Sequence, residues 1–131
     1  MKKVLFICAG NVARSQIAEA YYNNYTHSLN AASAGVLDFT PAKYGHPIPE
    51  VVAVMKEEGI DVSNKNVKTV TPGMVETADE IYVLCPEENV PDFVISNSKI
   101  TRWEVKDPFN LGIDSFREIR NQIKEKVKNI L

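Results

Sequence analysis

The sequence is poor in residues that form covalent and metal-bound frameworks. Its 131 residues include two cysteines and two histidines, which are spread along the chain. Two cysteines do not make the disulfide framework of a small secreted domain, and no clustered ligand spacing indicates a metal site. We therefore expect no metal and no cofactor, and we expect a nucleophilic or redox use of cysteine.

A strong net charge and long apolar runs are also missing. The formal net charge is −2 at pH 7, which gives no reason to expect nucleic acid or an anionic membrane as a partner. The apolar run after Lys3 is five residues long, too short for a signal-peptide core or a membrane span. These absences predict a cytoplasmic protein. The length, with 44% hydrophobic and 24% charged residues, is typical of one globular domain covering residues 1–131.

Strand-like and helical patterns alternate along the chain, which favours a parallel sheet with helical crossovers. Strands are expected at residues 3–8, 29–34, 80–85 and 100–105, and helices at about 15–27, at about 47–58, from 71 and from 115. Residues 36–49, with three prolines, are expected to form a loop. Ser115 and Glu118 have the spacing of a capping box at the start of the last helix. The apolar stripe of that helix is expected to be core: Phe116, Ile119, Ile123, Val127 and Ile130.

The most informative feature is a thiol followed, after five mostly small residues, by an arginine. Cys8 ends the first predicted strand, and a turn from there into a helix aims backbone N–H groups at one point. Arg14 can fork two oxygens of a tetrahedral oxyanion, and together with the helix terminus it favours the thiolate. An isolated cysteine here would be read as a small buried residue, but its neighbours favour catalysis. The predicted anion-binding loop consists of Ala9, Gly10, Asn11, Val12, Ala13, Arg14 and Ser15.

Two residue types inside this loop strengthen the hypothesis. Gly10 and Asn11 accept the positive φ that a tight anion-binding turn requires. Ser15 places a hydroxyl where it could donate to the sulfur of Cys8, both as attacking thiolate and as leaving group. The pattern predicts an activated nucleophile directly beneath a bound phosphate-like anion.

A second chemical feature, Asp107 with Pro108, follows the last predicted strand. Loops at the carboxyl ends of parallel strands converge on one crevice, so Asp107 can meet Cys8 there. Proline also keeps the preceding residue out of the α region, which presets the loop. Alone, this pair would be a common turn. Beside the Cys8 loop, Asp107 is predicted to protonate the leaving alkoxide or phenoxide and then to activate the water that hydrolyses a phosphocysteine.

These residues resemble a known superfamily over essentially the whole chain. The segments 8–15, 33–35 and 107–109 are similar to the low-molecular-weight protein tyrosine phosphatases and equally to the thioredoxin-coupled arsenate reductases of the same fold. The resemblance implies an α/β three-layer sandwich, with a four-stranded parallel sheet in strand order 2-1-3-4 flanked by helices. It also implies a phosphorylated protein or a small aryl phosphate as substrate.

Hydrolysis of phosphotyrosine-like aryl phosphates is the predicted activity, with Cys8, Arg14 and Asp107 as catalytic residues. The resemblance implies that Phe109, after the Asp-Pro pair, flanks an aryl ring. Phe39 and Tyr44 are candidates for the opposite wall of the substrate site, with local packing on their own loop as the alternative.

Arsenate reduction is the alternative that the sequence leaves open. Gln16, where the phosphatases usually have proline, resembles the reductases, and Cys85 would be their resolving thiol, with thioredoxin or glutaredoxin as reductant. The reductases carry a further resolving cysteine about seven residues later, where this chain has Asp92. Cys85 could instead be a buried thiol at a strand end. A phosphocarrier is a third reading, but it needs neither Arg14 nor a general acid.

The resemblance also bears on one ion. The potassium site of the reductases would match Asn11, Glu19 and Ser33, but Lys68 stands where an aspartate is expected. The lysine either replaces the ion with its own charge or means that no ion binds.

Overall fold

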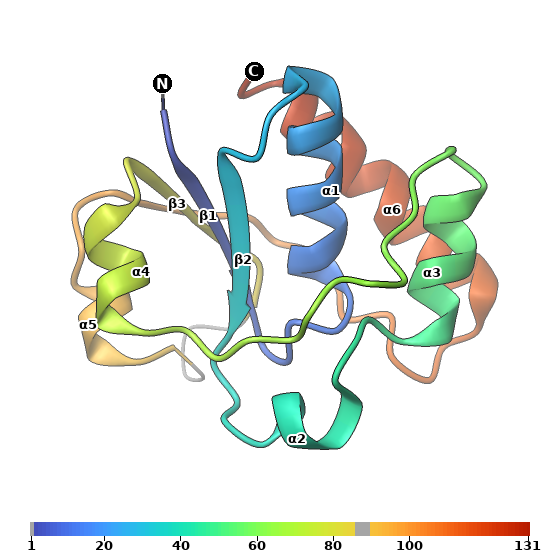
Figure 1. Cartoon of the computed structure of the whole chain (residues 1–131), viewed down its shortest axis with the longest axis horizontal. Helices are drawn as coiled ribbons and strands as arrows, with labels where there is room; N and C mark the ends of the chain where they lie inside the picture. Colours follow the sequence, from blue (N-terminus) through green and yellow to red (C-terminus); the bar gives the residue numbers. More distant parts are fainter. Residues whose placement is uncertain (1, 86–89) are drawn as a thin grey trace.

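The computed structural model describes residues 2–85 and 90–131, which form a parallel four-stranded sheet between two layers of helices (Figure 1). β1 (Val4–Cys8) lies in the middle, and all five of its residues are buried because helices cover both of its faces. Val4 of β1 is in register with Ala31 on one side and with Glu80 on the other. The other strands are β2 (Ala31–Gly35), β3 (Glu80–Val83) and β4 (Ile100–Arg102). Their order, β2-β1-β3-β4, confirms the predicted sandwich.

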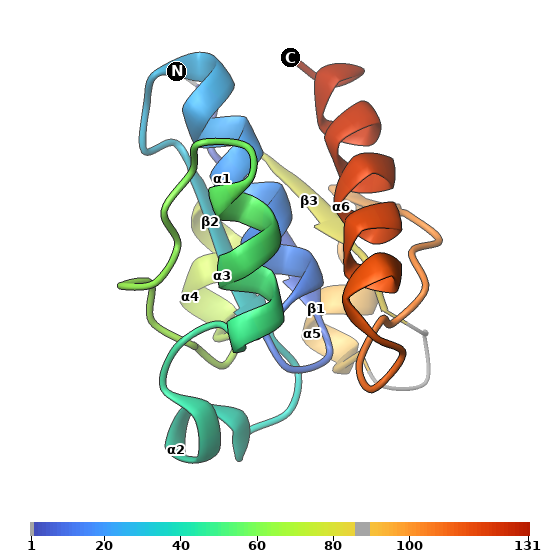
Figure 2. The ribbon, with the colours of Figure 1, turned by 90° about the vertical axis from the view of Figure 1, so that its right-hand side faces the viewer.

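The helices divide unequally between the two faces of the sheet (Figures 1 and 2). One face carries α1 (Arg14–Thr26), α3 (Pro49–Lys56) and α6 (Ile113–Lys128), and the other carries α4 (Pro72–Thr77) and α5 (Asp92–Ile95). The short α2 (Thr40–Tyr44) lies below the carboxyl ends of the strands in the view of Figure 1. Within residues 2–85 and 90–131, no helix has the length and apolar character needed to cross a bilayer.

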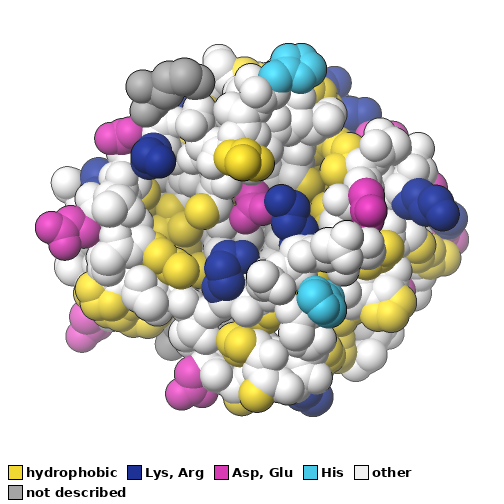
Figure 3. Space-filling model, viewed as in Figure 1, with side chains coloured by type: hydrophobic (Ala, Val, Ile, Leu, Met, Phe, Trp, Pro, Cys, Tyr) yellow, Lys and Arg dark blue, Asp and Glu magenta, His cyan; other side chains and the backbone are white. Residues whose placement is uncertain are grey.

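Alternation along β1 builds two cores. Phe6 points toward α1 and α6, where its ring lies 5.6 Å from that of Tyr82, whereas Leu5 and Ile7 point toward α4 and α5. The apolar stripe predicted for the last helix lines the first core: Phe116, Ile119, Ile123 and Val127 are buried, and Ile130 packs against them. Acidic and basic side chains are interspersed on the face seen in Figure 3, in keeping with the small net charge.

Several local predictions were wrong. The expected loop at 36–49 contains α2, with Pro41 in its first turn, where the ring presets a helical φ. The capping box does not form: α6 begins at Ile113, so Ser115 lies inside its first turn and donates its hydroxyl to the carbonyl of Leu111.

Strand ends and the segment before β4 also differ from expectation. β3 ends at Val83 and β4 at Arg102, both earlier than expected. The proline-punctuated stretch before β4 contains α5, and Pro86 at its start lies outside the described residues.

Candidate active site

The loop between β1 and α1 is held close to the end of β2. The carbonyl of Ala9 accepts the N–H groups of Val36 and Leu37, each at 2.9 Å. At Gly35 the two backbones approach so closely that a Cβ would lie 2.8 Å from the carbonyl oxygen of Ala9 and 2.9 Å from the nitrogen of Asn11. Glycine is therefore required at position 35 for the loop to occupy this place.

Cys8 is buried, and two groups form hydrogen bonds with its sulfur. The N–H of Asn11 lies 3.3 Å from Sγ, and the hydroxyl of Ser15 lies 2.9 Å from it. Asn11 has the left-handed conformation expected of it, with φ 58°. For Gly10 that expectation was wrong, because its φ is not left-handed. A Cβ at Gly10 would instead lie 3.3 Å from the methyl group of Thr40.

A chain of buried side chains runs from Ser15 into the protein. The amide nitrogen of Asn11 donates to the hydroxyls of Ser15 at 2.7 Å and Ser33 at 2.9 Å. Ser33 in turn donates to Glu19 at 2.9 Å. The thiol is therefore linked to a carboxylate through three intervening side chains, by hydrogen bonds shielded from water.

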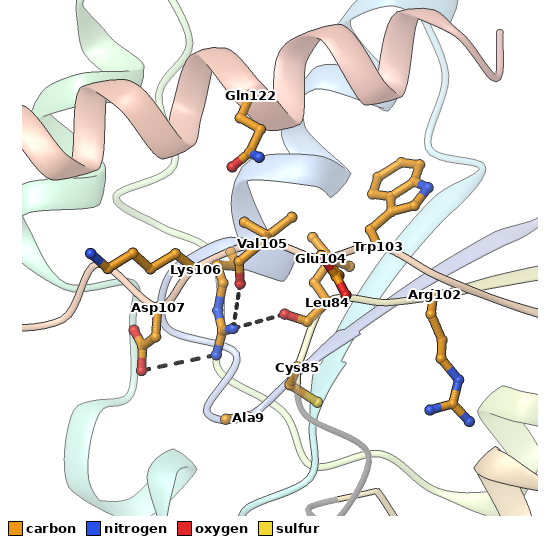
Figure 4. A pocket seen from close by; sticks show the side chains of 11 residues that line it. Ala9, Leu84, Cys85, Arg102, Trp103, Glu104, Val105, Lys106, Asp107 and Gln122 are labelled. Atoms are coloured by element: carbon orange, nitrogen blue, oxygen red, sulfur yellow. Dashed lines mark hydrogen bonds and ion pairs between the residues drawn. The ribbon is translucent and has the colours of Figure 1, made fainter.

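Arg14 is almost fully buried at the first turn of α1. Its Nη1 donates to the carbonyl oxygens of Leu84 at 2.7 Å and Val105 at 3.0 Å, which follow β3 and β4 (Figure 4). These two bonds fix the plane of the guanidinium, so Nε and Nη2 form the edge that remains for an anion. Nη2 lies 4.0 Å from the carboxylate of Asp107.

Asp107 stands at the mouth of the site. Its side chain is 57% exposed, and one carboxylate oxygen accepts the N–H of Phe109 at 3.0 Å. This turn holds the other oxygen on the side of Arg14, as the dashed contact in Figure 4 marks. Asp107 follows Cys8 by 99 positions, yet it lies at the same end of the sheet as the thiol, because loops at the carboxyl ends of parallel strands converge there.

A cavity of about 170 Å³ opens above the thiol. Arg14 and Asp107 line it together with Cys8, and most of the predicted anion loop contributes to it. Phe39, Tyr44 and Phe109 also line it, so the structure brings the three expected aromatic residues to one cavity. Phe39 and Phe109 are 53% and 40% exposed, as expected of side chains at an open rim.

A larger groove, of about 870 Å³, adjoins this cavity and shares Ala9, Arg14 and Asp107 with it. Cys85 lines the groove and not the cavity, and in Figure 4 Cys85 and Asp107 lie on either side of Ala9. Cys85 is half-buried, and both cysteines are thiols. The second thiol thus lies in a groove that borders the cavity of the nucleophile.

The residues expected at a potassium site do not fit a cation. Glu19 accepts the hydroxyl of Ser33 and pairs with the ammonium of Lys65 at 3.6 Å. Lys68 is half-buried beside this pair and donates to the carbonyl of Asn66; burial lowers its pKa, and the charge of Glu19 opposes that shift. Two ammonium groups thus stand near the one carboxylate. Elsewhere in the described chain, no group of three acidic, histidine or cysteine side chains is arranged to hold a metal.

Sequence reasoning missed several contributors to this site. The carbonyls of Leu84 and Val105 that hold Arg14 carry no side-chain signal, so only the packed sheet reveals them. The close approach at Gly35 could have been suspected from a glycine at the end of a strand. Lys65, which pairs with Glu19, lies in a stretch with no helical or strand-like period.

Three comparisons relate the chain to known proteins. The sequence profile of the low molecular weight phosphotyrosine protein phosphatases matches residues 3–131. A glutaredoxin arsenate reductase from Synechocystis sp. is 29% identical over 132 residues, which cover 100% of this chain and 97% of that protein.

Two solved structures have the same fold. One, described as an arsenate reductase in the phosphate binding state, superposes with a TM-score of 0.84 at 29% identity and covers 99% of this chain and 96% of its own. The low molecular weight protein tyrosine phosphatase from T. tengcongensis superposes with a TM-score of 0.80 at 24% identity, covering 99% and 97%, a likeness of fold.

Proposed function

The chain belongs to the low molecular weight phosphotyrosine protein phosphatase family, and on that premise we propose that it hydrolyses aryl phosphate monoesters through a phosphocysteine at Cys8. One observation carries this proposal. A single cavity combines a nucleophile, an anion-binding arginine and a carboxylate with an aromatic rim, and it is lined by Cys8, Arg14, Asp107, Phe39, Tyr44 and Phe109. Its substrate would be a phosphorylated protein or a small aryl phosphate.

Binding of the phosphoryl group uses the loop and the free edge of Arg14. Nε and Nη2 would fork two oxygens, while backbone N–H groups of the loop face the third. Most of the catalysis of phosphoryl transfer comes from such positioning and charge stabilisation. The phosphate-binding state of the related arsenate reductase supports a tetrahedral oxyanion as the ligand of this loop.

The reaction then proceeds in two displacements. The Cys8 thiolate attacks phosphorus, the bond to the ester oxygen breaks, and Asp107 gives its proton to that oxygen. Water attacks the phosphocysteine next, Asp107 takes the proton of the water, and the thiolate leaves with inorganic phosphate as product. The hydroxyl of Ser15, 2.9 Å from the sulfur, and the N–H of Asn11, 3.3 Å from it, stabilise the sulfur anion at both stages.

The proton transfer gives the decisive test. Asp107→Asn is expected to slow esters with poor leaving groups by about 10²- to 10⁴-fold, the usual contribution of a general acid. Esters whose leaving groups depart without a proton should lose less. The measurement is kcat/KM, which reports the displacement of the leaving group, over a series of aryl phosphates, with Asp114→Asn as control because that carboxylate is 93% exposed on α6. Equal losses across the series would contradict the role of Asp107.

Arsenate reduction is the second candidate, favoured by the position of Cys85 and by the relatives named arsenate reductases. Cys8 would attack arsenate, with water leaving. Cys85 would then attack the Cys8 sulfur, forming a disulfide and releasing arsenite, so that two thiols supply the two electrons. An external thiol protein of the thioredoxin or glutaredoxin class would reduce that disulfide. The need for reduced thiols supports a cytoplasmic location.

A parallel assay separates the two candidates. Purified protein is tested for hydrolysis of p-nitrophenyl phosphate and for arsenate-dependent thiol consumption, each with the wild type and with Cys85→Ala. A phosphatase should keep ester turnover within a few-fold in the variant. For a reductase, arsenate turnover should vanish in the variant, and arsenate should convert both thiols of the wild type to a disulfide seen by mass spectrometry.

A further inference from the structure

Gln16 has a buried side-chain amide whose nitrogen and oxygen have different hydrogen-bond surroundings. Its side chain is 1% exposed, and Nε2 donates to the side-chain oxygen of Asn11 at 3.1 Å and to the carbonyl of Asn66 at 2.9 Å. The other end, Oε1, is buried without a hydrogen-bond partner among the described residues. Leaving a buried acceptor unpaired costs free energy, so the two hydrogen bonds of the nitrogen end must offset the cost of burying Oε1 without a partner.

The orientation of both amides is fixed by backbone atoms. Lys68 N–H donates to Oδ1 of Asn11 at 3.0 Å, so that end of Asn11 must be the oxygen. A carbonyl such as that of Asn66 only accepts, so the end of Gln16 that faces it must be the nitrogen. Turning the Gln16 amide over would place its oxygen against two acceptors.

This orientation determines where the proton of Ser15 goes. With Oδ1 of Asn11 held by Gln16 and Lys68, its Nδ2 must face Ser15 and Ser33. Ser15 then receives a hydrogen from Asn11, and its own single hydroxyl hydrogen is left for the sulfur of Cys8 at 2.9 Å. If Asn11 turned over, its oxygen would accept that hydrogen and the sulfur would lose a donor.

We propose that Gln16 is a positioning residue, which fixes the amide of Asn11 so that Ser15 donates to the Cys8 thiolate. Its meaning for catalysis rests on the proposed function, but its effect on the thiol does not. The charged groups around the thiol are Arg14 and Asp107 at the cavity and Glu19 at the far end of the row of hydrogen bonds that starts at Ser15. None of these is changed in the variants below, and Gln16→Glu is the variant that adds a charge of its own.

The test follows the reactivity of Cys8 in a Cys85→Ala background, where it is the one cysteine of the chain. The rate of alkylation by iodoacetamide is measured against pH. Gln16→Met keeps the volume but removes the donor, and Gln16→Glu sets a carboxylate against Oδ1 of Asn11. We expect the midpoint of the profile to rise for both, by about one pH unit for Gln16→Glu, the size of a charge-assisted hydrogen bond. The shift for Gln16→Met should be smaller, because Lys68 N–H still holds Asn11.

Two further measurements exclude a merely structural effect. Ile17→Val removes one methyl from the neighbouring buried side chain of α1 and should leave the midpoint unchanged. In a Ser15→Ala background, Gln16→Met, which adds no charge, should no longer move the midpoint, because the hydroxyl through which it acts is gone. If Gln16→Glu does not fold, as judged by circular dichroism, Gln16→Met carries the test.

The outcomes separate this inference from the proposed function. Midpoints equal to that of the background for both Gln16 variants would overturn it, and so would a shift of Gln16→Met that persists without the Ser15 hydroxyl. A shift that depends on Ser15, in a protein that hydrolyses no aryl phosphate, would support the inference while the proposed function fails.

Discussion

A methyl group at position 35 should displace the loop between β1 and α1. In Gly35→Ala, the new Cβ would meet Ala9 O and Gly10 C at 2.8 Å, and both are backbone atoms that no rotamer change can move away. Ordinary van der Waals contact begins at 3.4 Å, so the loop has to move by about 0.6 Å, the difference between the two distances. Misplacement of reacting groups by about 1 Å can cost about 10²-fold, so we expect kcat/KM to fall about 10- to 100-fold.

The assay pairs activity with stability. Hydrolysis of p-nitrophenyl phosphate is measured well below the melting temperature, and urea unfolding reports the overpacking cost, about 1–3 kcal/mol. Gly73→Ala is the matched control: it lies in α4, its Cβ would come no nearer than 3.9 Å to Thr71, and alanine favours a helix by about 0.5–1 kcal/mol. A kcat/KM for Gly35→Ala within twofold of the wild type would show that the close approach at Gly35 does not position the loop.

Three other predictions follow from the same geometry. Arg14→Lys should lower kcat/KM by about 10²- to 10³-fold, because the three donors of an ammonium cannot bond both carbonyls and also fork two oxygens of the anion; near-normal turnover would make the arginine structural. Replacing Phe39 and Phe109 by alanine should reduce the preference for aryl over alkyl phosphates about tenfold, and an unchanged kcat/KM ratio would remove the aromatic rim from specificity. Hydrogen bonds from basic side chains of α6 lower the pKa values of Glu57 and Glu58, so their contribution to stability is present above pH 4.5 and is lost as the pH falls further. Urea unfolding from pH 6 to 3 should therefore show a steeper loss for the wild type than for the double glutamine variant.

The order of elements was within reach of the sequence because it depends on local patterns. The buried run at residues 4–8, the helical stripe from Phe116 and the alternation of the two element types each follow from the side chains of one segment. The strand order came from the resemblance to known families, and the structure bears it out. Boundaries were less predictable, as α2 and the start of α6 show, because helix ends depend on caps and on neighbouring loops.

The chemical groups of the site can be read from the sequence alone. A thiol, a guanidinium six residues later and a carboxylate before proline are covalent facts, and the rule that parallel strands deliver their following loops to one edge brings them together. Tertiary structure alone decided their geometry. Atoms from separate segments decide which carbonyls hold Arg14, how closely the loop approaches Gly35, and which way the amides of Asn11 and Gln16 face. Contacts between distant segments leave no periodic signal in the sequence of either segment.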